Sequence, residues 1–254
     1  MRQRWRLTVR SGPDARHAAH RDVVASWEAA VRASGLPLAE TQAATPRPRI
    51  VFAAPLPVGM LGEHELIDIG LTECRQAHEV RHAVLAAIPS GHELVDMHDV
   101  WTGAPTLPSL VVAADYSARV TVLPVAAKQA VDQATSGEGT PDEVTTDDGE
   151  AGRLLDAAVE AFLASPRVEI QREKGGGAIS LDIRPLVSRL QRGASLGDGA
   201  FGLHMRLRLG GAGGVGRPEE IVATLADGLP GPLRIDELVR ERILLVDDPP
   251  EADP

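Results

Sequence analysis

Cysteine is almost absent from this sequence, which has a single one, Cys74, among 254 residues. One thiol cannot form an intramolecular disulfide, and it cannot supply the several thiolates of a metal cluster. Aromatic residues are also scarce, at 3%, so aliphatic residues must build most of the core. No apolar run approaches the roughly 18 residues of a membrane span, and no signal-peptide pattern follows the basic start at 1–6. We therefore expect a cytoplasmic protein with no membrane partner.

The net charge is −10, and it is unevenly distributed along the chain. A general nucleic-acid coat protein needs a basic surface, so the overall charge argues against that class. Residues 1–50 nevertheless hold nine arginines against four carboxylates, whereas residues 132–150 hold seven carboxylates and no basic residue. The sequence therefore predicts an acidic disordered insert at 132–150 and an acidic tail at 247–254.

The first hundred residues alternate between strand and helix patterns. Alternating apolar and polar residues predict strands at 4–9, 49–54, 65–71 and 92–100. Apolar residues at helical spacing predict helices over 16–34 and 75–88. The order β-α-β-β-α-β is that of a split β-α-β, or ferredoxin-like, unit. We predict an N-terminal ferredoxin-like lobe at 1–100, with helices on one face of an antiparallel sheet and the other face free.

A similar order recurs after a proline-containing connector at 101–115. Strand patterns occur at 116–123, 168–173, 178–183, 201–209 and 242–246, and helical patterns at 154–164 and from Pro218 onward. The segment 184–200 fits this order poorly. The predicted fold is α+β, with two tandem ferredoxin-like lobes that have antiparallel sheets, and the C-terminal lobe spans 116–246.

One run of the sequence carries a family resemblance. Residues 35–59 end in Pro55-Leu56-Pro57-Val58-Gly59, and the first helix contains His20-Arg21-Asp22. With the segments 206–210 and 217–220, these residues resemble the radical-SAM-linked protein family, a bacterial family of unknown function. The chain departs from the family pattern at Ala43-Ala44 and at Arg47.

The resemblance implies a partner rather than a reaction, because family members are encoded beside, or fused to, a radical SAM enzyme. A three-cysteine iron–sulfur site is impossible here, so the chain is not itself the radical SAM catalyst. We expect a non-catalytic accessory protein that binds a substrate for a radical SAM enzyme and needs no cofactor. RNA is the second candidate partner, and RNA modification the candidate process.

The candidate binding residues fall into two groups. The family-like region contributes His20, Asp22, Gln42, Arg47 and Arg49. The second group is His204, Arg206, Arg208 and Arg217. The first three project from one face of the strand at 201–209, and Arg172 and Arg184, on neighbouring strands, are expected to share that face. A bare sheet face with these cations is suited to an anionic backbone such as RNA.

Arg217 follows a glycine run, 211–216, with G-x-G-x-x-G spacing. Dinucleotide binding requires a parallel β-α-β unit, whereas the alternating strands indicate an antiparallel sheet. A flexible turn is therefore favoured. A glycine loop that holds a phosphate together with Arg217 stays open.

The segment His78-Glu79-Val80-Arg81-His82 offers an alternative function. Its H-E-x-x-H spacing puts two imidazoles one helical turn apart, as in zinc proteases with a glutamate general base. The predicted core stripe of this helix lies at other positions, and no third ligand follows at the usual spacing. A surface helix is favoured, and a zinc-dependent hydrolase with His78 and His82 as metal ligands is the alternative.

Overall fold

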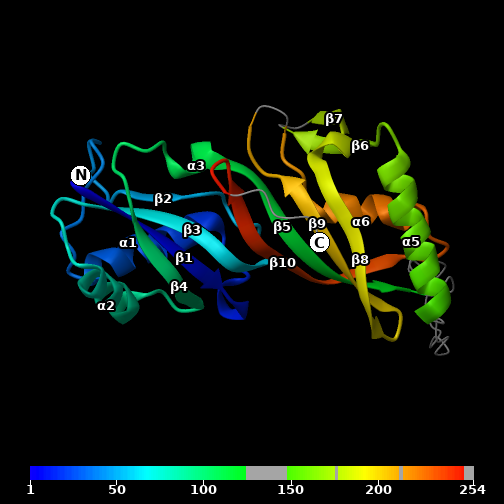
Figure 1. The fold of residues 1–254 in the computed structure, drawn as a ribbon, viewed down its shortest axis with the longest axis horizontal. Coiled ribbons are helices and arrows are strands. Elements are labelled where there is room, and N and C mark those ends of the chain that lie inside the picture. Colours follow the sequence, from blue (N-terminus) through cyan, green and yellow to red (C-terminus); the bar gives the residue numbers. More distant parts are fainter. Residues whose placement is uncertain (124–147, 175–176, 212–213, 249–254) are drawn as a thin grey trace. The chain divides into compact units, whose positions relative to one another are not determined.

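A computed structural model describes residues 1–123, 148–174, 177–211 and 214–248. The chain has a mixed α+β fold in which most paired strands are antiparallel (Figure 1). It divides into two compact units, one of Met1–Ala114, Leu209–Ala212 and Val239–Pro254, the other of Asp115–Arg208 and Gly213–Leu238. Strands β5 (Val111–Val122) and β10 (Leu233–Leu245) contribute residues to both units.

The sheet of the first unit has the strand order β4-β1-β3-β10, and the short strand β2 also pairs with β3. The bounds are Gln3–Ser11 for β1, Ile50–Phe52 for β2, Leu61–Leu71 for β3 and His92–Val100 for β4. Strands β1 to β4 pair antiparallel, whereas β10 pairs parallel with the start of β3 at Val239 and Arg240. The strand patterns of residues 1–100 are therefore found close to their predicted places.

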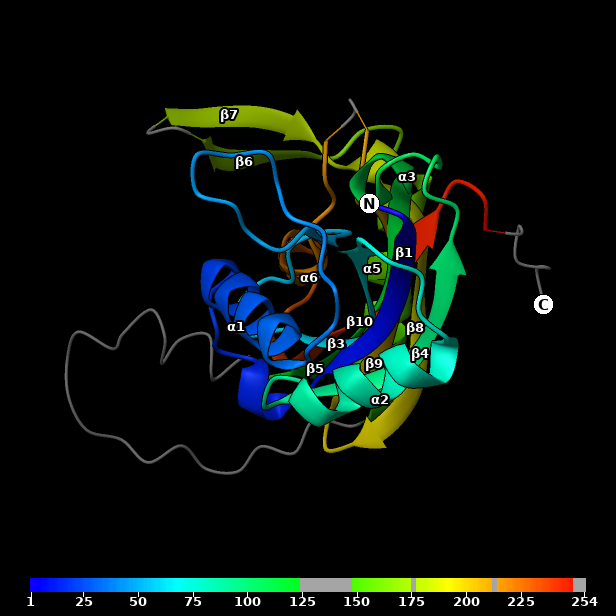
Figure 2. The same cartoon turned by 90° about the vertical axis from the view of Figure 1, so that its left-hand side faces the viewer.

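Two helices cover one face of this sheet (Figure 2). Helix α1 (His20–Ala33) buries Trp27 and Val31, and α2 (Ala77–Ala87) buries Val80 and Val84, at the helical spacing that the sequence predicts. These side chains form one core with apolar residues of β1 and β3: Trp5, Leu7, Val9, Ile67, Ile69 and Leu71. A 3-10 turn at Pro13–Ala15 precedes α1, so the helix begins four residues later than predicted.

The opposite face of this sheet is not free, which corrects one expectation. Arg6 and Asp68 are both buried, and Arg6 donates to both Asp68 oxygens, at 2.8 and 3.1 Å. Arg4 is also buried, and it donates to the main-chain carbonyls of Trp101, Ala104 and Pro105. Two arginines of the basic N-terminal region are therefore used inside the fold.

The second unit contains a four-strand path, β10-β5-β9-β8. Strand β8 spans Val187–Gly197 and β9 spans Ala200–Arg208, and they pair antiparallel. Helices α5 (Asp148–Ala164) and α6 (Pro218–Asp227) belong to this unit. Strands β6 (Glu169–Lys174) and β7 (Gly177–Asp182) form a separate two-stranded sheet, and Arg184–Leu186 is a short 3-10 helix.

Several predicted boundaries change. The proposed connector at 101–115 contains helix α3 (Leu107–Leu110) and the first residues of β5. The segment 184–200, which fitted the predicted order poorly, is mainly β8. The last three residues of the predicted acidic insert, 148–150, begin α5, whereas 132–147 and the tail residues 249–254 lie outside the described residues. Among the described residues, no helix is long and apolar enough to cross a bilayer.

A candidate binding pocket in the first unit

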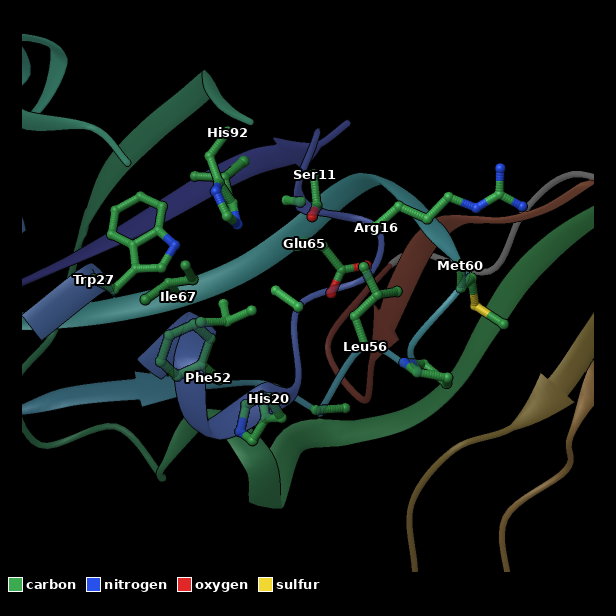
Figure 3. A pocket seen from close by; sticks show the side chains of 16 residues that line it. Ser11, Arg16, His20, Trp27, Phe52, Leu56, Met60, Glu65, Ile67 and His92 are labelled. Carbon is green, nitrogen blue, oxygen red and sulfur yellow. The ribbon is translucent and has the colours of Figure 1, made fainter. Parts of the chain in front are cut away.

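A pocket lies in the first unit, where the start of α1 and the segment 53–60 meet β1, β3 and the first residue of β4 (Figure 3). Its apolar lining includes Val9, Val23, Phe52, Leu56, Met60 and Ile67. The polar lining residues are Ser11, Arg16, His20, Trp27, Glu65 and His92. A mostly apolar cavity with a few convergent polar groups is the usual form of a small-molecule site. The cavity volume is about 30 Å³, which is room for about two water molecules.

Gly91 fixes one corner of the pocket. Its φ is +77°, and a Cβ at this position would lie 2.7 Å from the main-chain nitrogen of Ala15. Its carbonyl accepts from the amide of Gly12 at 2.8 Å. Glycine alone tolerates both the positive φ and the close approach. This turn brings His92 next to the chain that leads into α1.

Another wall of the pocket is held by a buried ion pair. Arg240 of β10 is 0% exposed; its Nε donates to Glu65 Oε1 at 2.8 Å, and its Nη2 pairs with Oε2. The same guanidinium donates to the carbonyls of Ala54 and Pro55, at 3.2 and 3.1 Å. Both carboxylate oxygens of Glu65 are therefore engaged, and the segment that begins at Ala54 is tied to the last strand. Removing one partner of a buried pair of this kind costs about 3–5 kcal/mol, because the other charge is left uncompensated.

Two aromatic side chains meet inside the pocket. The rings of Trp27 and His92 lie edge to face, with centroids 5.6 Å apart. Trp27 is 1% exposed, and within the described residues its indole Nε1 has no hydrogen-bond partner. A buried donor left without a partner costs about 1–3 kcal/mol. The pocket thus keeps an unmet hydrogen-bond donor.

His92 presents the complementary group. Its Nδ1 lies 3.2 Å from the carbonyl of Ser90, and because a carbonyl only accepts, Nδ1 carries the hydrogen. The other nitrogen of the neutral ring, Nε2, is then an acceptor. Burial lowers the pKa of His92, and this effect outweighs those of the Ser90 carbonyl and the Glu65 charge, which raise the pKa. The imidazole is therefore neutral at pH 7.

Of the five candidate binding residues in the family-like region, His20 alone lines this pocket. It is the first residue of α1, and its ring packs edge-on against Phe52 with a centroid distance of 5.4 Å. Asp22 is exposed and lies 3.3 Å from Arg21. Gln42, Arg47 and Arg49 are exposed residues of the chain before β2, and Arg47 lies 3.8 Å from Glu28. The structure does not gather these residues at one site.

The predicted cationic face of the second unit is partly neutralised. On β9, His204 and Arg208 are exposed, but Arg206 donates to both oxygens of Asp115 on β5, at 2.7 and 2.9 Å. Arg172 lies on β6, in the separate two-stranded sheet, and pairs with Glu220. The expectation that Arg172 shares the face of β9 is therefore wrong. Arg217 is exposed at the N-cap of α6, 3.6 Å from Glu220.

The H-E-x-x-H segment lies on α2, as its helical spacing predicts. His78 and His82 are exposed. Glu79 forms a capping box with Gln76, whose main-chain N–H donates to the Glu79 carboxylate at 2.8 Å. In the described part of the chain, no group of three His, Cys, Asp or Glu side chains is placed to hold a metal ion. The capping box at the start of α2 thus accounts for the position of Glu79.

The residues that define the pocket were not singled out as a site from the sequence. Trp27 is a buried residue of the helix predicted over 16–34, and Glu65 and His92 each begin a predicted strand, at 65–71 and 92–100. Arg240 gives no signal, because it lies before the strand predicted at 242–246, whereas β10 begins at Leu233. Only the Pro55–Gly59 run and His20, both from the family resemblance, pointed to this part of the molecule.

Comparison with known proteins places most of the chain in one family. The family model described as an uncharacterized protein conserved in bacteria (DUF2344) matches residues 4–237. No curated protein matches the sequence. The fold is similar to a chain in the crystal structure of a Cbf5-Nop10-Gar1 complex, with 10% sequence identity and a TM-score of 0.44. That match covers 95% of this chain and 49% of the other, so the chain spans about half the length of its counterpart.

Proposed function

The chain belongs to the DUF2344 family of uncharacterized proteins conserved in bacteria, and we propose for it a function that rests on its own residues. The protein is a non-catalytic accessory protein of the cytoplasm, which binds a substrate for a radical SAM enzyme. The observation that carries this proposal is the first-unit pocket, which is lined by His20 and by the Leu56-Pro57 part of the family-like run. The radical SAM partner rests on the family resemblance of those residues.

The chemistry of the pocket favours binding over reaction. The Glu65 carboxylate, the obvious general base, has both oxygens occupied by Arg240. The Nδ1 of His92 faces a main-chain carbonyl rather than a carboxylate, so the ring lacks the charged orienting partner of a catalytic-triad histidine. His20 packs against Phe52. These groups are suited to shaping and orienting a ligand.

We also propose that each unit is a ferredoxin-like lobe. Numbered in chain order, strands β1 to β4 of the first unit lie 4-1-3-2 (β4-β1-β3-β2). The strands β5, β8, β9 and β10 of the second unit lie in the same 4-1-3-2 order. The same order in both units supports a tandem arrangement, with the β6–β7 hairpin inserted in the second.

RNA binding by the outer side of β9 is the second candidate. Exposed His204 and Arg208, with exposed Arg189 on β8, support it. The pairing of Arg206 with Asp115 reduces the positive charge that this surface offers to phosphate. Zinc hydrolysis at His78 and His82 is the remaining alternative, and one equivalent of zinc that disappears in His78→Ala would establish it.

The main proposal is tested by anaerobic affinity purification of the tagged full chain from its native host. The expected result is co-purification of a protein that contains an iron–sulfur cluster and binds S-adenosylmethionine, together with its substrate. Recovery of RNA in place of such a protein would support the second candidate. Recovery of neither, above the level of untagged cells, contradicts both.

A further inference from the structure

The indole of Trp27 belongs to the core of the first unit, and its N–H group also lines the pocket. In Figure 3 its nitrogen faces the space between Ile67 and His92. Within the described residues this Nε1 has no acceptor, although the side chain is 1% exposed. Buried indole N–H groups usually find a partner, so an acceptor that enters the pocket would complete this one.

The surroundings of Trp27 select against a charged acceptor. The negative charge of Glu65 is balanced by Arg240, and His92 is held neutral by burial. Arg16 reaches the mouth, but its Nε donates to the carbonyl of Gly59 and its guanidinium points away from the interior (Figure 3). A carboxylate or phosphate would lose its hydration here without a compensating cation. A neutral acceptor loses much less.

The apolar walls define the rest of the ligand. Ile67 shares a core cluster with Trp27, Val23 and Phe52 pack against that cluster, and Leu56 and Met60 extend the apolar lining of the pocket. The cavity of about 30 Å³ holds about two waters, so a ligand with a ring requires the wall at 55–59 to move outward. This segment is held at its ends, by Arg240 at Pro55 and by Arg16 at Gly59, and is not part of a strand. An outward shift of this segment would therefore break no strand pairing.

We propose that this pocket binds a neutral, mostly apolar carbonyl compound, or the carbonyl-bearing end of a larger molecule, whose oxygen accepts the indole hydrogen of Trp27. The inference rests on the proposed function in one respect, since it names the chemical class of the substrate that the accessory protein would hold. Its apolar body lies against Phe52 and Leu56. The acceptor Nε2 of His92 receives any N–H that the ligand carries beside its carbonyl.

The three tryptophans provide the test, because their indole N–H groups give separate signals in a ¹H–¹⁵N spectrum. Trp27 lines the pocket; Trp5 is equally without a partner at Nε1 in the described structure but lines none of the described pockets; Trp101 is 77% exposed. The probes are cyclopentanone and methylenecyclopentane, which have nearly the same shape and differ in the carbonyl oxygen. Both are added to the full chain at equal concentrations.

The expected result is a saturable shift of the Trp27 signal with cyclopentanone, with an affinity about tenfold or more above that of the alkene. The signals of Trp5 and Trp101 stay in place. A Trp27 signal that moves with neither probe, or equally with both, overturns the proposal. Equal movement of all three signals would be a solvent effect and overturns it as well.

A pair of variants separates the pocket from the rest of the surface. Ala54→Leu places a larger side chain in the pocket lining and should abolish the Trp27 response, whereas Ala86→Leu makes the same change at an exposed position of α2 and should preserve it. Should Ala54→Leu fail to fold, the comparison of the two probes on the unaltered chain still decides. A chain that captures an iron–sulfur enzyme but shows no Trp27 response loses this inference and keeps the proposed function.

Discussion

Arg240 and Glu65, 175 residues apart in the sequence, form an ion pair in which the guanidinium is fully buried and both carboxylate oxygens are engaged. The pair joins β10 to β3, beside the two residue pairs through which these strands lie parallel. The same guanidinium holds the carbonyls of Ala54 and Pro55. One side chain from the end of the chain thus determines where a wall of the pocket lies.

Replacing Arg240 by methionine should destabilise the protein by about 3–5 kcal/mol, because Glu65 is left as an uncompensated buried charge. Urea unfolding of the full chain measures the loss. Arg10→Ala is the matched control, since it breaks exposed pairs with Glu63 and Glu93 and should leave the unfolding midpoint nearly unchanged. The double variant Arg240→Met, Glu65→Met should recover much of the loss. Equal midpoints for Arg240→Met and Arg10→Ala would contradict the role given to this pair.

His92 should make stability dependent on pH below neutrality. Burial lowers its pKa from the ordinary value of 6.5, so the unfolded chain binds the proton more readily than the folded one. Stability is then complete above pH 6.5 and is lost as the pH falls from 6.5 toward the lower folded pKa. Free energies of unfolding at pH 7.5 and 5.5 measure the effect. In His92→Gln the difference between the two values should shrink, and an undiminished difference would assign it to other groups.

Two substitutions of Glu79 distinguish a role as a helix cap from a role as a catalytic base. Glu79→Ala removes the carboxylate that accepts from the main-chain N–H of Gln76 and should lower stability by about 0.5–1 kcal/mol. Glu79→Gln should retain most of the cap, because glutamine serves at this position of a capping box. A zinc hydrolase would instead lose its activity in both variants to the same degree. Thermal unfolding together with a peptidase assay of the two variants separates these outcomes.

Asp115 should control any RNA affinity of the second unit. Asp115→Asn removes the charge that pairs with Arg206, so binding to single-stranded RNA should strengthen and its salt dependence should steepen by about one phosphate contact. Arg208→Ala, at an exposed position of β9, should weaken binding and flatten the salt dependence. Filter binding across a range of salt concentrations reports both changes. An RNA affinity that changes neither with salt concentration nor with either substitution would exclude this surface as the RNA-binding site.

The sequence predicted regular elements well where apolar side chains alternate against polar ones. Leu203, Met205 and Leu207 on β9 are buried at every second position, and Val80 and Val84 mark the inner side of α2. β8 was not recognised because serine, arginine and glycine dominate its sequence. This strand is held in place by its antiparallel pairing with β9, which the local sequence of β8 does not predict.

The buried polar groups of the first unit are harder to predict because they depend on contacts distant in sequence. Arg4 and Arg6 alternate with apolar residues as solvent-facing side chains would, yet both are buried, since Asp68 and the carbonyls of 101–105 are brought to them by the fold. Glu65 and Arg240 likewise become a buried pair only through the pairing of β3 with β10. Period-two patterns report which side chains share a face, but not whether other chain segments cover that face.

Because β5 and β10 each supply residues to both units, the two units are not consecutive pieces of the polypeptide. A fragment cut at residue 115 would keep Glu65 but lose Arg240, and would carry a buried carboxylate that nothing neutralises. Dissection into halves for expression, or exchange of one half between relatives, should therefore yield insoluble material. Gene fusions that preserve function are expected at the ends of the chain or at its loops rather than at its midpoint.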